Sequence, residues 1–388
     1  MKQGWEIKKL GEVATIVGGS TPKTNVPSFW DGEHFWVAPA ELDGDKYISS
    51  TQRTITDAGV KDAHLQLLPT GTVLLSSRAP IGKVAITTVP MYCNQGFKNL
   101  VCSDKLYNEF AYWFLYHNTE YLNSLGTGAT FKEISKRVVE QIPISVPPRE
   151  EQERIVAELD CLSGIIERKR EQLKQLDALA QSIFYQMFGD PITNEKGWEV
   201  KKLGEVCDVR DGTHDSPKYL ECSDYVLITS KNITNDGNID FSTANYISKE
   251  DYESINKRSY VESGDIIMAM IGTIGKPIIV KETDKKFCIK NVALIKFGCS
   301  TMVINTYIKA MLNNPDYGQY IQSQNKGGTQ KFVALGTIRN LPIPLPSMEI
   351  QQLFAEKIEA IEKQKELIKK SISETENLFN ARMDYYFN

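Results

Sequence analysis

The 388-residue sequence has few of the features that mark a metal site, a membrane span or a secreted protein. Its seven cysteines form no C-x-x-C pair, and none of its four histidines lies two to five residues from another histidine or from a cysteine. Because zinc sites are normally marked by such close pairs, we expect no metal site and reduced, mostly packed cysteines. No apolar run approaches the ~20 residues of a membrane-spanning helix, and the N-terminus lacks the apolar core of a secretory signal. We therefore expect a cytoplasmic protein.

The sequence also lacks an excess of positive charge, which nucleic-acid-binding proteins usually have. Lys and Arg number 45 against 49 Asp and Glu, for a net charge of −4. Residues 1–148 contain 14 basic and 14 acidic residues, and residues 189–346 contain 19 of each. The net charge of these two segments therefore does not indicate what they bind.

The chain contains two copies of one unit. The sequence GWEIKKLGEV at residues 4–13 recurs as GWEVKKLGEV at residues 197–206, an offset of 193. The segment QIPI at residues 141–144 aligns with NLPI at residues 340–343, at an offset of 199. Near-identity in register over ten residues indicates duplication of a ~190-residue unit whose interior has diverged.

Each unit is predicted to be a mixed domain of helices and strands. Short β-branched runs are separated by Gly and Asn clusters, which is typical of strands joined by turns. The expected elements, given for the first and second copy, are an opening strand-like stretch (5–17 and 198–209), one helix (107–122 and 303–312) and a closing strand containing prolines (142–148 and 341–346).

After each closing strand the pattern becomes helical. Residues 149–188 contain no proline and a single glycine, and apolar residues recur at alternating intervals of four and three, as in a coiled coil. The same register, shifted by 199, continues in residues 347–388. Forty residues make a helix roughly 60 Å long, too long for a ~150-residue domain to cover. The heptad positions are Ile155, Leu159, Leu162, Ile166, Lys169, Leu173, Leu176, Ala180, Ile183 and Met187, then Phe354, Ile358, Ile361, Lys365, Ile368, Ile372, Thr375, Phe379 and Arg382.

The predicted fold is therefore α+β, with two tandem α/β domains and two long helices that form an antiparallel coiled coil with pseudo-two-fold symmetry. The alternative is that each amphipathic helix lies on its own domain. The predicted division is residues 1–148 for the first domain, 149–189 for the first helix, 190–346 for the second domain and 347–388 for the second helix.

This order of parts resembles the DNA-specificity subunit of type I restriction–modification systems, and the resemblance spans the whole chain. Each matching motif is weak alone, but their order and duplication are specific. Beyond the two openings, the motifs are Gly18-Gly19-Ser20-Thr21-Pro22, Trp30-Asp31-Gly32 with Trp36-Val37, Asp211-Gly212-Thr213-His214, Gly327-Gly328-Thr329-Gln330-Lys331, Glu150-Glu151-Gln152 and Glu349-Ile350-Gln351-Gln352.

The resemblance implies that the two domains are target recognition domains, each reading one half of a split sequence in double-stranded DNA. It implies that the helices are spacers that dock two methyltransferase (modification) subunits, which restriction/translocase subunits join. S-adenosylmethionine, ATP and Mg would be bound by those partners, and this chain would be a non-catalytic subunit without a cofactor. The residues agree, because the chain has neither a GxxxxGK[ST] phosphate loop nor the loops of an adenine methyltransferase.

DNA contacts are expected in loops that differ between the copies, with Lys and Arg on phosphates and other side chains on base edges. Gly18-Gly19 and Gly212 would let the backbone approach a phosphate, although a plain polar turn is the alternative. Arg78 could pair with guanine or form a surface salt bridge, and the amides Gln95 and Asn291 could pair with adenine or be buried turn residues. We favour the Gly/Thr/Lys loops before the closing strands. The candidates are Thr21, Lys23, Arg78, Lys83, Gln95, Thr127, Thr130, Lys132 and Lys136 in the first copy, and Arg210, Thr213, His214, Lys218, Lys276, Asn291, Lys326, Thr329 and Lys331 in the second.

On the helices, the candidates for docking partner subunits are Arg168, Arg170, Gln172, Gln364 and Lys369. Two domains related by a two-fold axis would read two different half-sites separated by an unread spacer. The competing interpretation is a duplicated, non-catalytic coiled-coil scaffold that binds protein or glycan. A fragment of a single-chain restriction–modification enzyme fits the two-copy layout and the N-terminal start less well.

Overall fold

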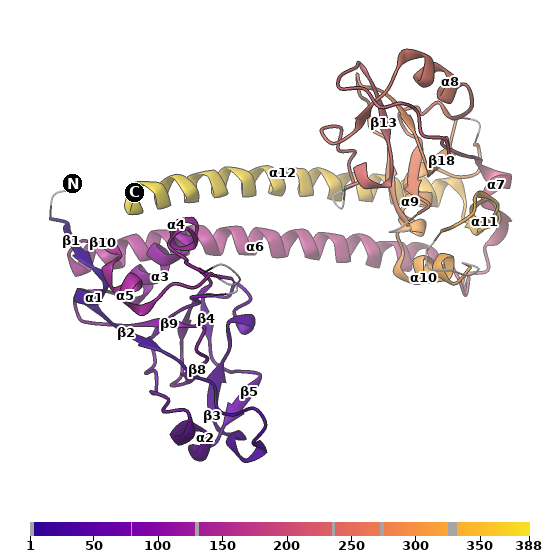
Figure 1. The fold of residues 1–388 in the computed structure, drawn as a ribbon. Coiled ribbons are helices and arrows are strands. Elements are labelled where there is room, and N and C mark those ends of the chain that lie inside the picture. Colours follow the sequence, from indigo (N-terminus) through magenta and orange to yellow (C-terminus); the bar gives the residue numbers. More distant parts are fainter. Residues whose placement is uncertain are drawn as a thin grey trace. The chain divides into compact units, whose positions relative to one another are not determined.

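The computed structural model describes residues 4–78, 80–128, 132–234, 237–271, 275–298, 300–324 and 332–388. The chain divides into two compact units, Met1–Arg170 with Lys370–Asn388, and Glu171–Lys369. Each unit holds one domain of mixed helices and strands together with parts of two long helices, α6 (Arg149–Phe188) and α12 (Met348–Phe387) (Figure 1). The predicted α+β class with two tandem domains is confirmed.

In the first unit the described strands form a two-stranded sheet (β1-β10), a five-stranded sheet (β2-β9-β6-β7-β4) and a three-stranded sheet (β5-β3-β8). The strands are β1 (Glu6–Lys9), β2 (Ala14–Gly18), β3 (Trp30–Val37), β4 (Tyr47–Ile48), β5 (Arg53–Ile55), β6 (Val73–Leu75), β7 (Val84–Thr87), β8 (Tyr92–Cys93), β9 (Lys98–Cys102) and β10 (Pro143–Val146). The helices are α1 (Leu10–Val13), η1 (Pro27–Phe29), η2 (Pro39–Glu41), α2 (Asp57–Asp62), α3 (Asn108–His117), α4 (Thr119–Ser124) and α5 (Lys136–Gln141).

The second unit repeats this plan with a two-stranded sheet (β11-β19), a four-stranded sheet (β12-β18-β15-β16) and a three-stranded sheet (β14-β13-β17) among its described strands. The strands are β11 (Glu199–Lys202), β12 (Asp208–Asp211), β13 (Tyr225–Ile228), β14 (Asn245–Tyr246), β15 (Ile266–Ala269), β16 (Gly275–Ile279), β17 (Lys286–Ile289), β18 (Val292–Lys296) and β19 (Pro342–Leu345). The helices are α7 (Leu203–Val206), η3 (Ser230–Asn232), α8 (Lys249–Ser259), α9 (Asn305–Leu312), α10 (Pro315–Ser323) and α11 (Leu335–Arg339).

The opening stretch of each copy is not one strand, so that prediction was wrong in detail. A single helical turn, α1 or α7, separates two strands that belong to different sheets. In the first copy the Glu12 carboxylate accepts a hydrogen bond from the Lys9 backbone N–H at 3.0 Å, which caps the turn. Leu10 and Val13, three residues apart, are both buried by it. The single helix predicted in each copy is likewise followed by a second one, α4 or α10.

The closing strands can contain prolines because each pairs with one partner only. β10 is antiparallel to β1, with Lys9 opposite Pro143, and β19 is antiparallel to β11, with Lys202 opposite Pro342. In a two-stranded sheet each strand has an outer edge where a missing N–H breaks no ladder. The closing strand therefore holds the start of its own domain at the point where the long helix begins.

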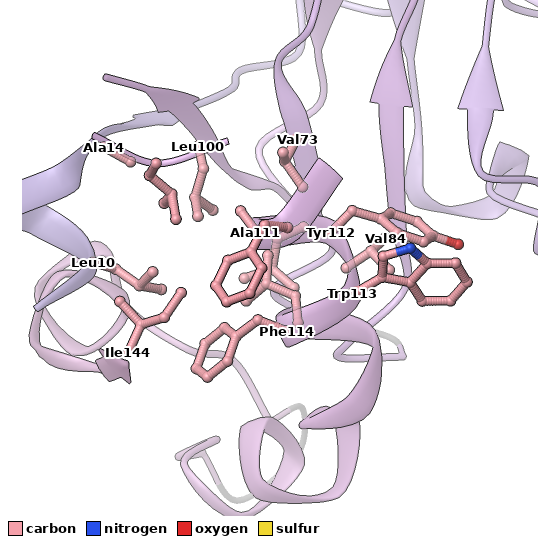
Figure 2. Close-up of a cluster of buried hydrophobic side chains, with 14 of the residues drawn as sticks. Leu10, Ala14, Val73, Val84, Leu100, Ala111, Tyr112, Trp113, Phe114 and Ile144 are labelled. Atoms are coloured by element: carbon pink, nitrogen blue, oxygen red, sulfur yellow. The ribbon is translucent and has the colours of Figure 1, made fainter. Parts of the chain in front are cut away.

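The core of the first unit lies between the five-stranded sheet, α3 and the long helices. Figure 2 shows Val73, Leu100 and Ala14 from the sheet facing Ala111 and Phe114 of α3. The same cluster includes residues from the beginning of α6 and the end of α12, such as Leu159 and Met383. Burial of these apolar side chains fixes each long helix against the domain.

The helices α6 and α12 pack antiparallel in each unit taken by itself. In the first unit, Glu158 pairs with Arg382 and Lys169 with Thr375, so residue numbers on one helix rise as those on the other fall. In the second unit, Asp177 pairs with Lys365 at 2.8 Å, and Phe184 lies against Phe354. All predicted heptad positions are buried or half-buried. The antiparallel coiled-coil prediction is confirmed.

Candidate nucleic-acid interface

Each domain contains the same local turn arrangement, formed where the chain leaves β2 or β12. The Ser20 backbone N–H donates to the Cys93 carbonyl oxygen, and the Thr213 N–H donates to the Ile289 carbonyl oxygen, both at 3.0 Å. We call residues 20–21 with 94–96 the first turn pair and residues 213–214 with 290–291 the second turn pair. In both, the chain after the first strand lies against the segment that enters the neighbouring strand, β9 or β18.

Glycine is required at the base of each turn pair. A Cβ on Gly19 would lie 2.1 Å from the Cys93 carbonyl oxygen, and one on Gly212 would lie 2.3 Å from that of Ile289. Both contacts are too short for any other residue without movement of the backbone. We expected these glycines to admit a phosphate, but the close approach that they allow is to the protein's own chain.

The first turn pair brings together three of the predicted residues. The Thr21 hydroxyl donates to the Gln95 side-chain oxygen and accepts a hydrogen bond from the Asn94 side-chain amide at 3.0 Å. The backbone of Arg78 pairs with Glu133, and its Nε lies 3.3 Å from the position that a Cβ on Gly96 would occupy. The Arg78 side chain therefore lies beside the turn, and Gln95 is exposed.

The second turn pair brings together His214 and Asn291. The His214 Nδ1 lies 2.9 Å from the Asn291 side-chain oxygen, and its Nε2 lies 3.0 Å from the Asp211 carboxylate. Asp211 is buried and also accepts a hydrogen bond from Arg258 of α8. The hydrogen bonds to Asn291 and Asp211 raise the pKa of His214, because both stabilise the protonated ring.

Several other basic candidates have partners within the protein. Lys23 forms an ion pair with Asp62 at 3.2 Å, and the Lys83 ammonium donates to the carbonyl oxygens of Pro39 and Leu42 at 3.4 and 2.6 Å. Arg210 pairs with Asp208 at 2.6 Å. Of the remaining described candidates in the second copy, Lys218 and Lys276 are exposed, and the polar but uncharged Thr213 is half-buried.

The Gly/Thr/Lys loops that we favoured are described only in part. Thr127 forms a backbone bridge with Glu133, and Lys132 and Lys136 are exposed just before and at the start of α5. Lys136 also faces Glu140 at 3.8 Å, one turn along the helix. The candidates Thr130, Lys326, Thr329 and Lys331 lie outside the described residues.

The comparison with known families decides between the two interpretations left open by the sequence. The chain matches the type I restriction modification DNA specificity domain twice, over residues 2–177 and 195–377. The chain belongs to this family. The duplicated-scaffold alternative is not supported.

Two relatives are similar to this chain over nearly its whole length. The MjaIX specificity subunit of Methanocaldococcus jannaschii is 31% identical over 382 residues, which cover 90% of this chain and 85% of that one. The MjaVIII specificity subunit of the same organism is 24% identical and covers 97% of this chain and 92% of the relative.

Solved structures show the same fold. The S subunit of a type I restriction-modification system from M. genitalium superposes with a TM-score of 0.60 at 14% identity, and the match covers 99% of this chain and 96% of that one. A chain from a structure of a type I R-M system superposes with a TM-score of 0.64 at 20% identity, and covers 100% and 98%.

On the long helices of this chain, most of the predicted docking residues are exposed to solvent. Arg168, Arg170, Gln172 and Gln364 are exposed, and Lys369 is half-buried. Arg170 forms an ion pair with Glu376 at 2.6 Å, and Lys369 forms one with Glu366 at 3.3 Å.

Two residues that organise the second turn pair, Asp211 and Arg258, are not among the residues predicted from the sequence. Asp211 belongs to the quoted Asp-Gly-Thr-His motif, but a buried carboxylate cannot be recognised from spacing alone. Arg258 lies 44 residues after His214 and reaches Asp211 only in the folded chain. Among the described residues, no group of three or more His, Cys, Asp or Glu side chains could hold a metal ion. Within that same part of the chain, no helix is long and apolar enough to cross a membrane.

Proposed function

We propose that the chain is the DNA sequence-recognition subunit of a type I restriction–modification complex and reads a bipartite target, one domain for each half-site. The observation that carries this proposal is the double match to the specificity domain, because two copies of one reader suit a target in two parts. The subunit itself performs no chemistry. It acts in the cytoplasm on double-stranded DNA.

The two half-sites differ in sequence under this proposal. The turn pairs have equivalent backbone positions but different side chains, Thr21 and Gln95 in one and His214 and Asn291 in the other. Side chains that reach base edges decide which bases a domain prefers. The remaining basic candidates supply contacts to phosphate, which set the register on the duplex.

Two modification subunits dock on the helices α6 and α12, and restriction/translocase subunits join through them. The exposed positions Arg168, Arg170, Gln172 and Gln364, together with Lys369, are the proposed contacts. The domains that read DNA are residues 1–148 and 190–346, and the helices between and after them are the spacers. S-adenosylmethionine, ATP and Mg belong to the partner subunits.

Methylation sequencing of genomic DNA is the direct test. Cells that express the modification subunit with this chain should contain methylated adenine at one bipartite motif. Cells with the modification subunit alone, or with this chain alone, should lack it. Absence of a motif despite an active modification subunit would contradict the proposed function.

The nearly balanced charge of each recognition domain predicts weak DNA binding by the isolated chain. Partner subunits would supply the remaining contacts to phosphate. Titration of labelled motif DNA with the chain, alone and with its modification subunits, measures this contribution. A nanomolar dissociation constant for the chain alone at physiological salt would contradict it.

A further inference from the structure

The two turn pairs share one chemical property beyond their backbone geometry, which is the direction in which a side-chain amide is held. Building on the proposed function, we propose that Gln95 and Asn291 read their half-sites as hydrogen-bond donors through the amide nitrogen. We further propose that Asn291 holds this direction only while His214 is protonated.

In the first turn pair, the direction of each hydrogen bond follows from one backbone group. The Gly96 backbone N–H can only donate, and it donates to the Asn94 side-chain oxygen at 2.7 Å. The Asn94 amide nitrogen therefore faces Thr21, to whose hydroxyl it donates at 3.0 Å. The hydroxyl proton of Thr21 is then directed to Gln95, whose oxygen accepts it.

The result is an exposed glutamine whose oxygen is held by the protein. Within the part of the chain that the structure describes, the Gln95 amide nitrogen has no hydrogen-bond partner, so both of its hydrogens are available to a ligand. The path from Gly96 through Asn94 and Thr21 contains no group that titrates near neutral pH. The direction of this amide therefore does not depend on pH.

In the second turn pair, the direction depends on an imidazole. The Asp211 carboxylate is buried and can only accept, so the His214 Nε2 at 3.0 Å must carry a hydrogen. The other ring nitrogen, Nδ1, faces the Asn291 oxygen at 2.9 Å, which also accepts. With the Asn291 oxygen in this position, both ring nitrogens carry hydrogens, which is the imidazolium form of His214 that we propose.

The charged groups around His214 are consistent with this state. Asp211 of β12 stabilises the positive charge, whereas Arg258 of α8, which pairs with Asp211, opposes it. The hydrogen bonds to Asn291 and Asp211 outweigh the effects of burial and of the Arg258 charge, and raise the pKa of His214. Lys290, beside Asn291, is directed to Ser216.

Loss of the proton from His214 would reverse the direction of Asn291. Since Asp211 retains the hydrogen on Nε2, the Nδ1 hydrogen leaves and that nitrogen becomes an acceptor. The Asn291 amide then rotates to place its nitrogen toward His214, and its oxygen faces outward. The second domain would change from a donor to an acceptor at this position, while the first domain would not change.

This difference has a direct meaning for base preference. In the major groove guanine offers two acceptors, N7 and O6, whereas cytosine offers the N4 donor. A donor amide therefore favours guanine over cytosine, and an outward-facing oxygen loses that preference. Arg78, beside Gln95, adds further donors to the first turn pair.

The test uses the complete chain assembled with its modification subunits, and synthetic duplexes that carry the motif found by methylation sequencing. Each base pair of the motif is replaced in turn, and discrimination is the preference of the complex for the original base pair over its replacement. The variants Gln95→Glu and Asn291→Asp replace the amide nitrogen by oxygen but keep the oxygen that accepts from Thr21 or His214. Each should lose ~5- to 150-fold of discrimination at one base pair, in the first or the second half-site respectively. Gln66→Glu and Gln322→Glu, which add the same charge at exposed positions in each domain, should lose none.

A pH series on the unmodified complex tests the role of His214. Between about pH 6 and pH 9, discrimination at the Asn291 position should fall, and discrimination at the Gln95 position should stay constant. A fall at both positions, or at neither, would overturn the protonation switch.

The outcomes separate this inference from the proposed function. If the unmodified complex recognises one bipartite motif and both Gln95→Glu and Asn291→Asp keep its full discrimination, the donor assignment is overturned and the proposed function stands. If the unmodified complex methylates no bipartite motif, both the donor assignment and the proposed function are overturned. Equal melting temperatures for the four variants and the unmodified chain would show that a change in discrimination does not come from misfolding.

Discussion

The Gln152 side chain of α6 accepts a hydrogen bond from the Tyr107 backbone N–H at 2.7 Å, across 45 residues of sequence. Its amide nitrogen donates to the carbonyl oxygens of Lys105 and Pro147, both at 2.9 Å. Gln351 repeats this arrangement at the start of α12, with Ile304, Met302 and Pro346. At the start of each long helix, one buried glutamine thus makes three hydrogen bonds to its own domain.

Replacement of either glutamine by leucine should destabilise its domain. Gln152→Leu and Gln351→Leu each leave a buried N–H and two carbonyl oxygens without their partner, at a cost of ~2–4 kcal/mol of unfolding free energy. Urea unfolding followed by circular dichroism measures the change. The neighbouring Gln352 is exposed, so Gln352→Leu is the matched control and should change stability by less than ~0.5 kcal/mol. Equal losses in Gln351→Leu and Gln352→Leu would show that the buried hydrogen bonds are not the cause.

The two turn glycines should be intolerant of alanine. Gly19→Ala and Gly212→Ala place a Cβ within 2.1 and 2.3 Å of a carbonyl oxygen, so the turn must open at a cost of ~2–4 kcal/mol. Thermal unfolding should detect this loss. Gly298→Ala serves as the control, because a Cβ there meets nothing within 4 Å. Unchanged melting temperatures for Gly19→Ala and Gly212→Ala would contradict the close packing of the turn pairs.

The pair of Glu158 and Arg382 should make the helix pairing sensitive to acid. The hydrogen bond from Arg382 lowers the pKa of Glu158. Because the folded pKa lies below the unfolded value of ~4.3, this stabilisation is complete above that value and is lost as the pH falls through the folded pKa. Both side chains are about a third exposed, so Glu158→Gln should cost only ~0.5–1 kcal/mol at neutral pH.

Unfolding free energies of Glu158→Gln and the unmodified chain, measured over a pH series, check this expectation. Their difference should be constant near neutral pH and vanish in acid. The exposed Glu167 supplies the comparison, and Glu167→Gln should differ little from the unmodified chain at any pH. A difference that grows as the pH falls would have the wrong sign for a carboxylate with a lowered pKa.

The lengths of α6 and α12 should set the distance between the half-sites. Insertion of one heptad in each helix, after Arg170 and after Lys369, adds roughly 10 Å of helix, or about three base pairs of DNA. Methylation sequencing should return the same two half-sites with a correspondingly longer spacer. Seven residues inserted after the exposed Glu282, in a loop of the second domain, should leave the spacer unchanged. An unchanged spacer in the variant with longer helices would contradict the proposal that helix length sets the distance between the half-sites.

The local sequence was sufficient to predict the duplication, the two long helices and their pairing. Heptad spacing is a local property, and it predicts Lys169 in the helix interface as a polar occupant. In the structure its ammonium donates to Ser371 and Thr375 of the opposite helix, at 2.7 and 3.0 Å. The closing strands that contain prolines are also present as predicted, and each pairs with one partner strand only, which tolerates them.

The opening stretch shows where local reasoning failed. Leu10 and Val13 fit a strand by composition, yet a capped helical turn buries both of them against α5 and the sheet. Tertiary burial decided between two conformations whose intrinsic preferences differ little.

The sequence by itself made Thr21 and His214 candidates, because they lie in loops that differ between the copies. It made Gln95 and Asn291 candidates because amide side chains can pair with adenine. Only the tertiary structure decided how they act. Thr21 meets Gln95 across 74 residues, and His214 meets Asn291 across 77. The direction of a hydrogen bond and the charge of an imidazole depend on which donor or acceptor lies opposite, and those partners come from strands that are distant in sequence and adjacent in the sheet.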